Sequence, residues 1–150
     1  MKRRVLGIFQ LVVAATMAPQ VFFFGVPGLL GSLGMSESGH FDADLSGVPR
    51  LYYWSLLIAS FSLVIAMILA FAGAVLTLAK PSQFSIRACL AGAFFYWIFI
   101  AGSLVISYAL GIYFSFRYLT VWDVIEYPIG IAAAAVAYAL FSQTKVAHAS

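Results

Sequence analysis

Two carboxylates, Asp123 and Glu126, are the side chains best placed for chemistry. They open a stretch that is otherwise apolar to residue 141, and Arg117 lies shortly before them. Residues three apart on a helix lie on nearly the same face, so both carboxylates can act on one cation or one arginine. Acids within a membrane span usually face other helices and have a partner, because exposure to lipid is costly. We therefore take Arg117, Asp123 and Glu126 as the candidate polar cluster.

Structural roles also explain these residues. Thr120 followed by Asp123 fits a capping box, in which short polar side chains bond the free N–H groups at a helix start. For Glu126, three interpretations stay open: a structural ion pair with Arg117 or Arg50, a ligand or ion path, and a side chain that reaches the outer water.

A second polar feature is Tyr96, in the sequence FFYWIF, which falls near the middle of an apolar run. A buried tyrosine hydroxyl needs a hydrogen-bond partner. Gln10, Thr16 and Gln20 of the first apolar run are candidates, and Thr16 is the one that we expect near the right depth. An aromatic stripe in a membrane helix more often reflects packing than a pocket.

The rest of the sequence gives no positive sign of catalysis. The loop at 35–44 holds one histidine and three acids without a recognised ligand spacing, which fits a solvated acidic loop better than a metal site. Cys89 is the only cysteine, so no internal disulfide forms. We find no nucleophile–base set and no phosphate loop, and we expect no catalytic, cofactor-binding or metal-binding residues. The net charge of +3 implies no nucleic-acid partner.

Composition places these residues in a membrane protein. Of the 150 residues, 64% are hydrophobic and 9% are charged, whereas about a quarter are charged in a typical soluble domain. A hydrocarbon core of about 30 Å needs about 20 helical residues. The sequence predicts one integral membrane domain over residues 1–150, an all-α bundle of four transmembrane helices in the lipid bilayer. The predicted spans are 5–24, 51–79, 88–116 and 121–141.

The segment GVPGLLGSLG, residues 25–34, is the least regular of the apolar segments. Its glycines and proline disfavour a regular helix, while its leucines and valine are too apolar for a solvated loop. We expect the first helix to end near Phe24. Residues 25–34 then lie in the membrane interface or re-enter the membrane, as the first part of an outer loop at 25–50.

Basic residues predict the orientation, since cytoplasmic loops carry an excess of lysine and arginine. With both termini inside, two basic residues, Arg50 and Arg117, lie outside. We therefore expect an N-in, C-in topology, in the bacterial inner (plasma) membrane. The basic residues on the cytoplasmic side are then Lys2, Arg3, Arg4, Lys80, Arg87 and Lys145.

Small residues recur every four positions in three of the four apolar runs. Such ridges let helix backbones approach closely, which matters because lipid supplies no hydrophobic force between helices. They predict a compact bundle, with partners either in this chain or in another subunit. The ridges are Ser62, Ala66, Ala70 and Ala74; Ser103, Ser107 and Gly111; and Gly130 and Ala134.

The small-residue ridges, and the absence of a predicted buried charge near mid-membrane, favour a non-catalytic accessory or assembly subunit. It would pack on other subunits of a larger membrane complex, or on copies of itself. The alternative is a small oligomeric transporter or a lipophilic-ligand-binding membrane protein with Arg117, Asp123 and Glu126 at its outer entrance. Cation-coupled carriers usually have an ionisable group nearer mid-depth. An intramembrane enzyme with Glu126 as acid or base needs a second group, such as Tyr118 or Tyr127, and is the least favoured.

Overall fold

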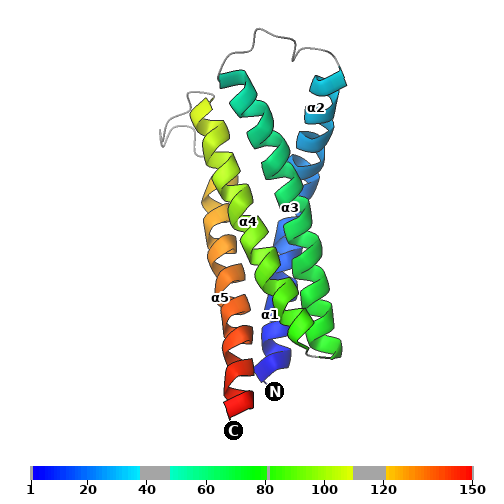
Figure 1. Cartoon of the computed structure of the whole chain (residues 1–150), viewed down its shortest axis with the longest axis vertical. Coiled ribbons are helices and arrows are strands. Elements are labelled where there is room, and N and C mark those ends of the chain that lie inside the picture. The colour runs from blue at the N-terminus through cyan, green and yellow to red at the C-terminus, as the bar shows by residue number, and fades with distance from the viewer. Residues whose placement is uncertain (1, 38–47, 81, 110–120, 150) are drawn as a thin grey trace.

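The computed structural model describes residues 2–37, 48–80, 82–109 and 121–149, and nearly all of them are helical (Figure 1). Four stretches are long and apolar enough to cross a membrane: Arg4–Leu33, Tyr53–Ala79, Gln83–Ser107 and Ile125–Ser142. This confirms the predicted all-α class with four apolar helices and supports an integral membrane protein. The elements are α1 (Lys2–Gln20), a π-helical turn η1 (Val21–Gly25), α2 (Val26–Glu37), α3 (Val48–Ala79), α4 (Gln83–Ala109) and α5 (Val121–Ala149).

The four spans form a ring. α3 packs against α1 and α4, and α5 packs against α4 and α1, so α1 and α4 lie on one diagonal of the bundle. α2 packs against α3 and leans away from α4 and α5 (Figure 1). Both ends of the chain lie at the same end of the bundle (Figure 1), as an even number of crossings requires. Which end faces the cytoplasm stays a prediction.

The first helix does not end near Phe24. The chain passes through the π-helical turn and continues as α2 to Glu37. Pro27 lies just after the π-helical turn, where the hydrogen-bonding pattern of the helix already changes. Gly28 has a packing role: a Cβ added there would collide with the side chain of Ser60 on α3. Gly28 therefore serves close packing and Pro27 accompanies a local change of helix type, while the placement of residues 25–34 in the bilayer stays a prediction.

α3 and α4 approach each other at glycines. A Cβ added at Gly92 of α4 would lie 2.9 Å from the backbone nitrogen of Ala70 on α3. A Cβ on Gly73 would lie 2.6 Å from the Cys89 sulfur, and one on Gly102 would lie 2.7 Å from the Cβ of Ala59. Real Cβ atoms do not come this close, so the two backbones pack at a separation that only glycine permits. Such dense contacts drive helix association in lipid.

The predicted small-residue ridges lie at different depths in the bundle. All four ridge residues of α3, from Ser62 to Ala74, are buried. On α4, Ser103 and Ser107 are only partly buried, because Gly92 and Gly102 make the close contacts instead, and Gly111 lies outside the described residues. On α5, the ridge residue Gly130 is buried and Ala134 is partly buried, while Ala133 and Ala137 are fully buried.

Gly92→Ala should destabilise the bundle, because the new methyl group meets the backbone of Ala70, which cannot move aside. We expect a loss of about 1–3 kcal/mol of unfolding free energy, measured by reversible unfolding in detergent. Gly31→Ala is the matched control: among the described residues, nothing lies within 4 Å of a Cβ at that position. It should leave stability unchanged or raise it by up to about 1 kcal/mol through helix propensity. Equal effects of the two changes would contradict the close α3–α4 contact.

Candidate functional site

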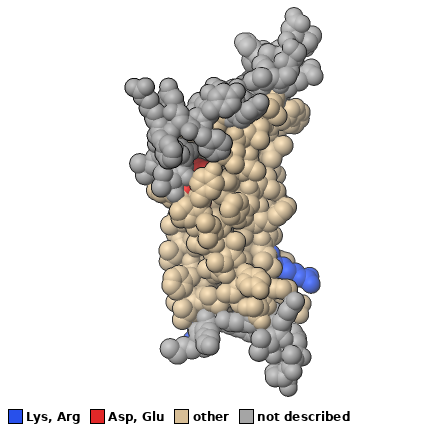
Figure 2. All heavy atoms as spheres, turned by 90° about the vertical axis from the view of Figure 1, so that its left-hand side faces the viewer, with Lys and Arg blue, Asp and Glu red and all other residues tan. Residues whose placement is uncertain are grey.

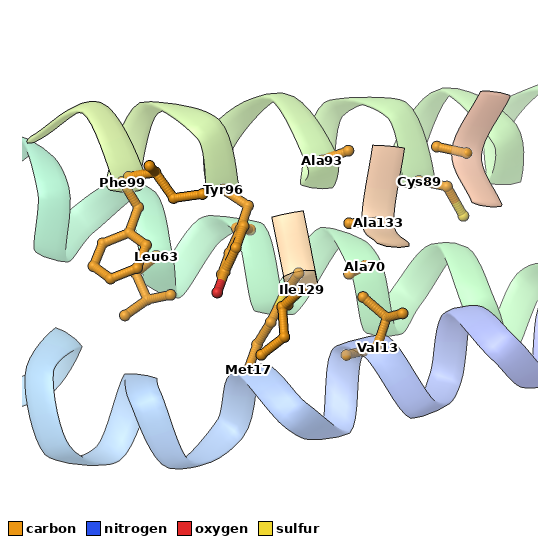
Figure 3. Close-up of a cluster of buried hydrophobic side chains, with 14 of the residues drawn as sticks. Val13, Met17, Leu63, Ala70, Cys89, Ala93, Tyr96, Phe99, Ile129 and Ala133 are labelled. Carbon is orange, nitrogen blue, oxygen red and sulfur yellow. The ribbon is translucent and has the colours of Figure 1, made fainter. Parts of the chain in front are cut away.

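Tyr96 of α4 lies at the centre of the candidate site. Its side chain has no exposed surface, and its hydroxyl donates a hydrogen bond of 2.8 Å to Oε1 of Gln20. Figure 3 shows the ring crossing the interior with its hydroxyl directed toward α1, between Leu63 and Ile129. Because α1 and α4 lie on a diagonal of the ring, this hydrogen bond crosses the middle of the bundle.

Gln20 reaches Tyr96 because the first helix is longer than the sequence suggests. A helix that ends near Phe24 places Gln20 near the outer membrane surface, whereas in the span Arg4–Leu33 it lies near the middle. Tyr96 likewise lies near the middle of the span Gln83–Ser107. The expectation that Thr16 is the residue at the right depth was therefore wrong. Thr16 is exposed on the bundle surface and donates to the backbone oxygen of Val13 at 2.7 Å.

Glu126 comes from the third helix that meets at this site, α5. It is 7% exposed and shares the buried face of α5 with Ile129 and Ala133. Its carboxyl lies close enough to Tyr96 for the two groups to interact electrostatically. One turn further along α5, a Cβ on Gly130 would lie 3.4 Å from the Tyr96 ring, so a glycine there lets the ring pack against the α5 backbone. Glu126 is thus a buried residue of the bundle interior.

Two buried amides face the interior without full hydrogen bonding. Gln10 and Gln20 have no exposed surface. Among the described residues, Nε2 of Gln20 and both side-chain atoms of Gln10 have no hydrogen-bond partner. A buried polar group without a partner costs about 1–3 kcal/mol, so such groups in a native structure usually mark bound water, a ligand or a working site.

The backbone next to Gln20 is also unusual. Pro19 precedes it inside α1, and the π-helical turn Val21–Gly25 follows it directly. Proline removes one backbone hydrogen bond from the helix. Single π-helical turns inside α-helices are frequent at functional sites, where they redirect the side chains that follow. Gln20 is therefore held at the one place where the first helix departs from regular α geometry in the described chain.

The structure describes only part of the predicted polar cluster of Arg117, Asp123 and Glu126. Asp123 lies in the first turn of α5, and Arg50 lies in the first turn of α3, but the description does not extend to their side chains. Arg117 and Thr120 lie outside the described residues, so the ion pair and the capping box stay predictions. The sequence suggested Gln20 only as one possible partner for Tyr96, and the structure makes it a residue of the candidate site. Its position as a glutamine within an apolar run is the sequence feature that could have identified it.

Chemically, the site offers oxygen ligands, including one carboxyl group. It combines a carboxyl, a phenol and an amide, which suit a proton or a small cation better than a redox or nucleophilic reaction. Within the described ranges, no group of three or more His, Cys, Asp or Glu residues is placed to hold a metal ion. Comparisons with protein-family models, curated proteins and solved structures gave no match. The geometry of this site is therefore the basis for the proposed function.

Tyr96→Phe should lower the free energy of unfolding by about 0.6–1.7 kcal/mol, the range measured for hydrogen bonds between membrane helices. The physical reason is that the change removes the donor to Gln20 and nothing else. Tyr138→Phe is the matched control, because Tyr138 is 69% exposed on the bundle surface. Its stability should equal that of the wild type.

A double-mutant cycle with Gln20→Leu isolates the pair. Replacing Gln20 should cost less in the Tyr96→Phe background than in the wild type, since the hydrogen bond is already gone there. Strictly additive effects would show that the two side chains do not interact.

Proposed function

We propose that this protein is a small membrane transport protein that takes up a proton or a monovalent cation at Glu126, between α1, α4 and α5. The observation that supports this proposal is the burial of Glu126 one turn from the place where α5 packs against Tyr96, which is itself bonded to Gln20. A carboxyl removed from water is stable there when it is neutralised by a proton or cation, or held by a partner. Ionisable groups of this kind commonly mark ion pathways.

The burial of Glu126 favours transport over a side chain that only reaches the outer water. On the sequence alone, the acids lie at the outer edge of the membrane, which favours an accessory subunit. In the structure, Glu126 is the second residue of its span, but it is buried and lies one turn from Gly130, where α5 packs against the Tyr96 ring. The candidate cluster with Arg117 and Asp123 then serves as the outer entrance to this site. The small size of the chain favours an oligomeric transporter.

The accessory-subunit function remains the second candidate, and a different observation supports it. The turn η1 and helix α2 pack against α3, and their other face carries large apolar side chains. Phe22 is 71% exposed and Leu30 is 65% exposed. Lipid or the helix of another subunit can cover this face. Reproducible co-purification of one large membrane partner in equal amounts would favour this second function.

The orientation that we propose is N-in and C-in, in the inner membrane of a bacterium. Arg4, Lys80 and Arg87 are exposed, and they belong to the end of the bundle that carries both termini. Figure 2 shows basic atoms toward this end and acidic atoms toward the opposite end of the apolar surface. This separation supports the cytoplasmic assignment of the basic end.

Glu126→Gln should abolish cation flux, because the amide cannot exchange a proton or balance the charge of a cation. Flux is measured in proteoliposomes with a trapped pH indicator for protons, and with imposed sodium and potassium gradients for the two alkali ions. Glu37→Gln is the control, since it makes the same chemical change at the end of α2. It should retain wild-type flux.

Two results would contradict the proposed transport function. One is wild-type protein that, folded and reconstituted, carries none of the three cations faster than empty vesicles. The other is full flux in a folded Glu126→Gln variant.

A further inference from the structure

Gln10 of α1 is a second buried polar position, and the site described above does not include it. Its side chain has no exposed surface, and neither amide atom has a hydrogen-bond partner among the described residues. It lies ten residues before Gln20, which is about 15 Å toward the end of the bundle that carries the termini.

Other buried polar side chains in this half of the bundle bond to backbone oxygens three or four residues before them. The hydroxyl of Thr77 donates to the backbone oxygen of Gly73 at 2.7 Å, and that of Ser85 donates to the backbone oxygen of Ser82 at 2.7 Å. Hydroxyl groups can do this because they are short and lie close to the preceding turn. Gln10 makes no such bond, so its two amide donors and its acceptor need partners from elsewhere.

Both small and large side chains line the interior between Gln10 and Gln20, including Val13 and Met17 of α1. Ala70, Ala93 and Ala133 come from three different helices and point into this region (Figure 3). Gln10 therefore places an amide in an otherwise largely apolar interior. A buried amide that has no partner in the protein can be satisfied by water.

We infer that the Gln10 amide is a hydration site that opens to the cytoplasmic side, and that it forms the inner exit for a cation released from Glu126. The hydration of Gln10 follows from its burial and unmet hydrogen bonds alone. Its role as an exit rests on the proposed transport function. The two parts are separable by experiment.

Cysteine labelling tests the hydration of Gln10. Methanethiosulfonate reagents react with ionised thiols, which form in water and not in lipid or a dry interior. Gln10→Cys is made in a Cys89→Ala background, which removes the only native cysteine. Ile8→Cys in the same background is the matched control, because Ile8 lies at nearly the same depth and is 54% exposed on the lipid-facing surface.

With reagent supplied from the cytoplasmic side, Gln10→Cys should react at least about tenfold faster than Ile8→Cys. Both variants are first checked for wild-type elution and helicity. Equal, slow labelling of two folded variants would overturn the inference. If Gln10→Cys does not fold, Gln10→Leu replaces it: a marked rise in the thermal midpoint would show that the amide was dry and overturn the inference, and an unchanged or lower midpoint would support it.

The flux assay separates this inference from the proposed function. Rapid labelling of Gln10→Cys in a protein that carries no cation would support the hydration site and contradict the transport function. Cation flux in the wild type with no labelling at position 10 would uphold transport and overturn the Gln10 exit. If both hold, Gln10→Leu should lower the flux about tenfold or more, since it removes the water that the amide binds.

Discussion

The hydrogen bond between Tyr96 and Gln20 is the interaction on which the interior of this bundle depends. The lipid offers no water to a polar side chain, so each such group needs a partner in the protein or a water held inside the bundle. Packing joins neighbouring helices around the ring, whereas this bond joins the diagonal pair α1 and α4. It therefore fixes the height of α1 relative to α4, and with it the set of side chains that surround Glu126.

The tightly packed pair α3 and α4 forms one side of the polar site. Gly73, Gly92 and Gly102 bring the two backbones together along most of their length. α4 can then present Tyr96 from a fixed position, while α1, with Pro19 and the π-helical turn on either side of Gln20, is the less regular partner. The bundle thus combines one tightly packed helix pair with one helix whose geometry changes at the polar site.

The sequence predicts the four helices well, because each apolar run is long enough to span a bilayer and little else in the chain competes with that signal. It also identifies Glu126, since a carboxylate in an apolar helix is costly and stands out. The end of the first helix is not predictable in the same way. Pro27 and the glycines that follow it are unfavourable in an average helix, yet here Pro27 lies just after the π-helical turn and Gly28 lies against Ser60. Both features depend on how this segment packs and bends in the folded protein, and amino-acid composition does not reveal that.

That error in helix length also hides the polar site. Which side chains share a depth depends on where every helix starts and ends, so Thr16 was favoured over Gln20 as the partner of Tyr96. The sequence also did not reveal that Glu126, the second residue of its span, is buried among the helices. On α4, serines were expected at the helix contact where glycines lie, because spacing alone does not reveal which face of a helix meets its neighbour.

The most direct test of the account is whether the buried carboxyl of Glu126 exchanges its proton or cation with the aqueous phase. Difference infrared spectra of the reconstituted protein, recorded between buffers that differ in pH or in alkali cation, report this, with Glu126→Gln as the reference that assigns the band. The account predicts a Glu126 carboxyl band that responds to the medium and is missing from the variant. A folded wild-type protein whose Glu126 band does not respond to either change would contradict it.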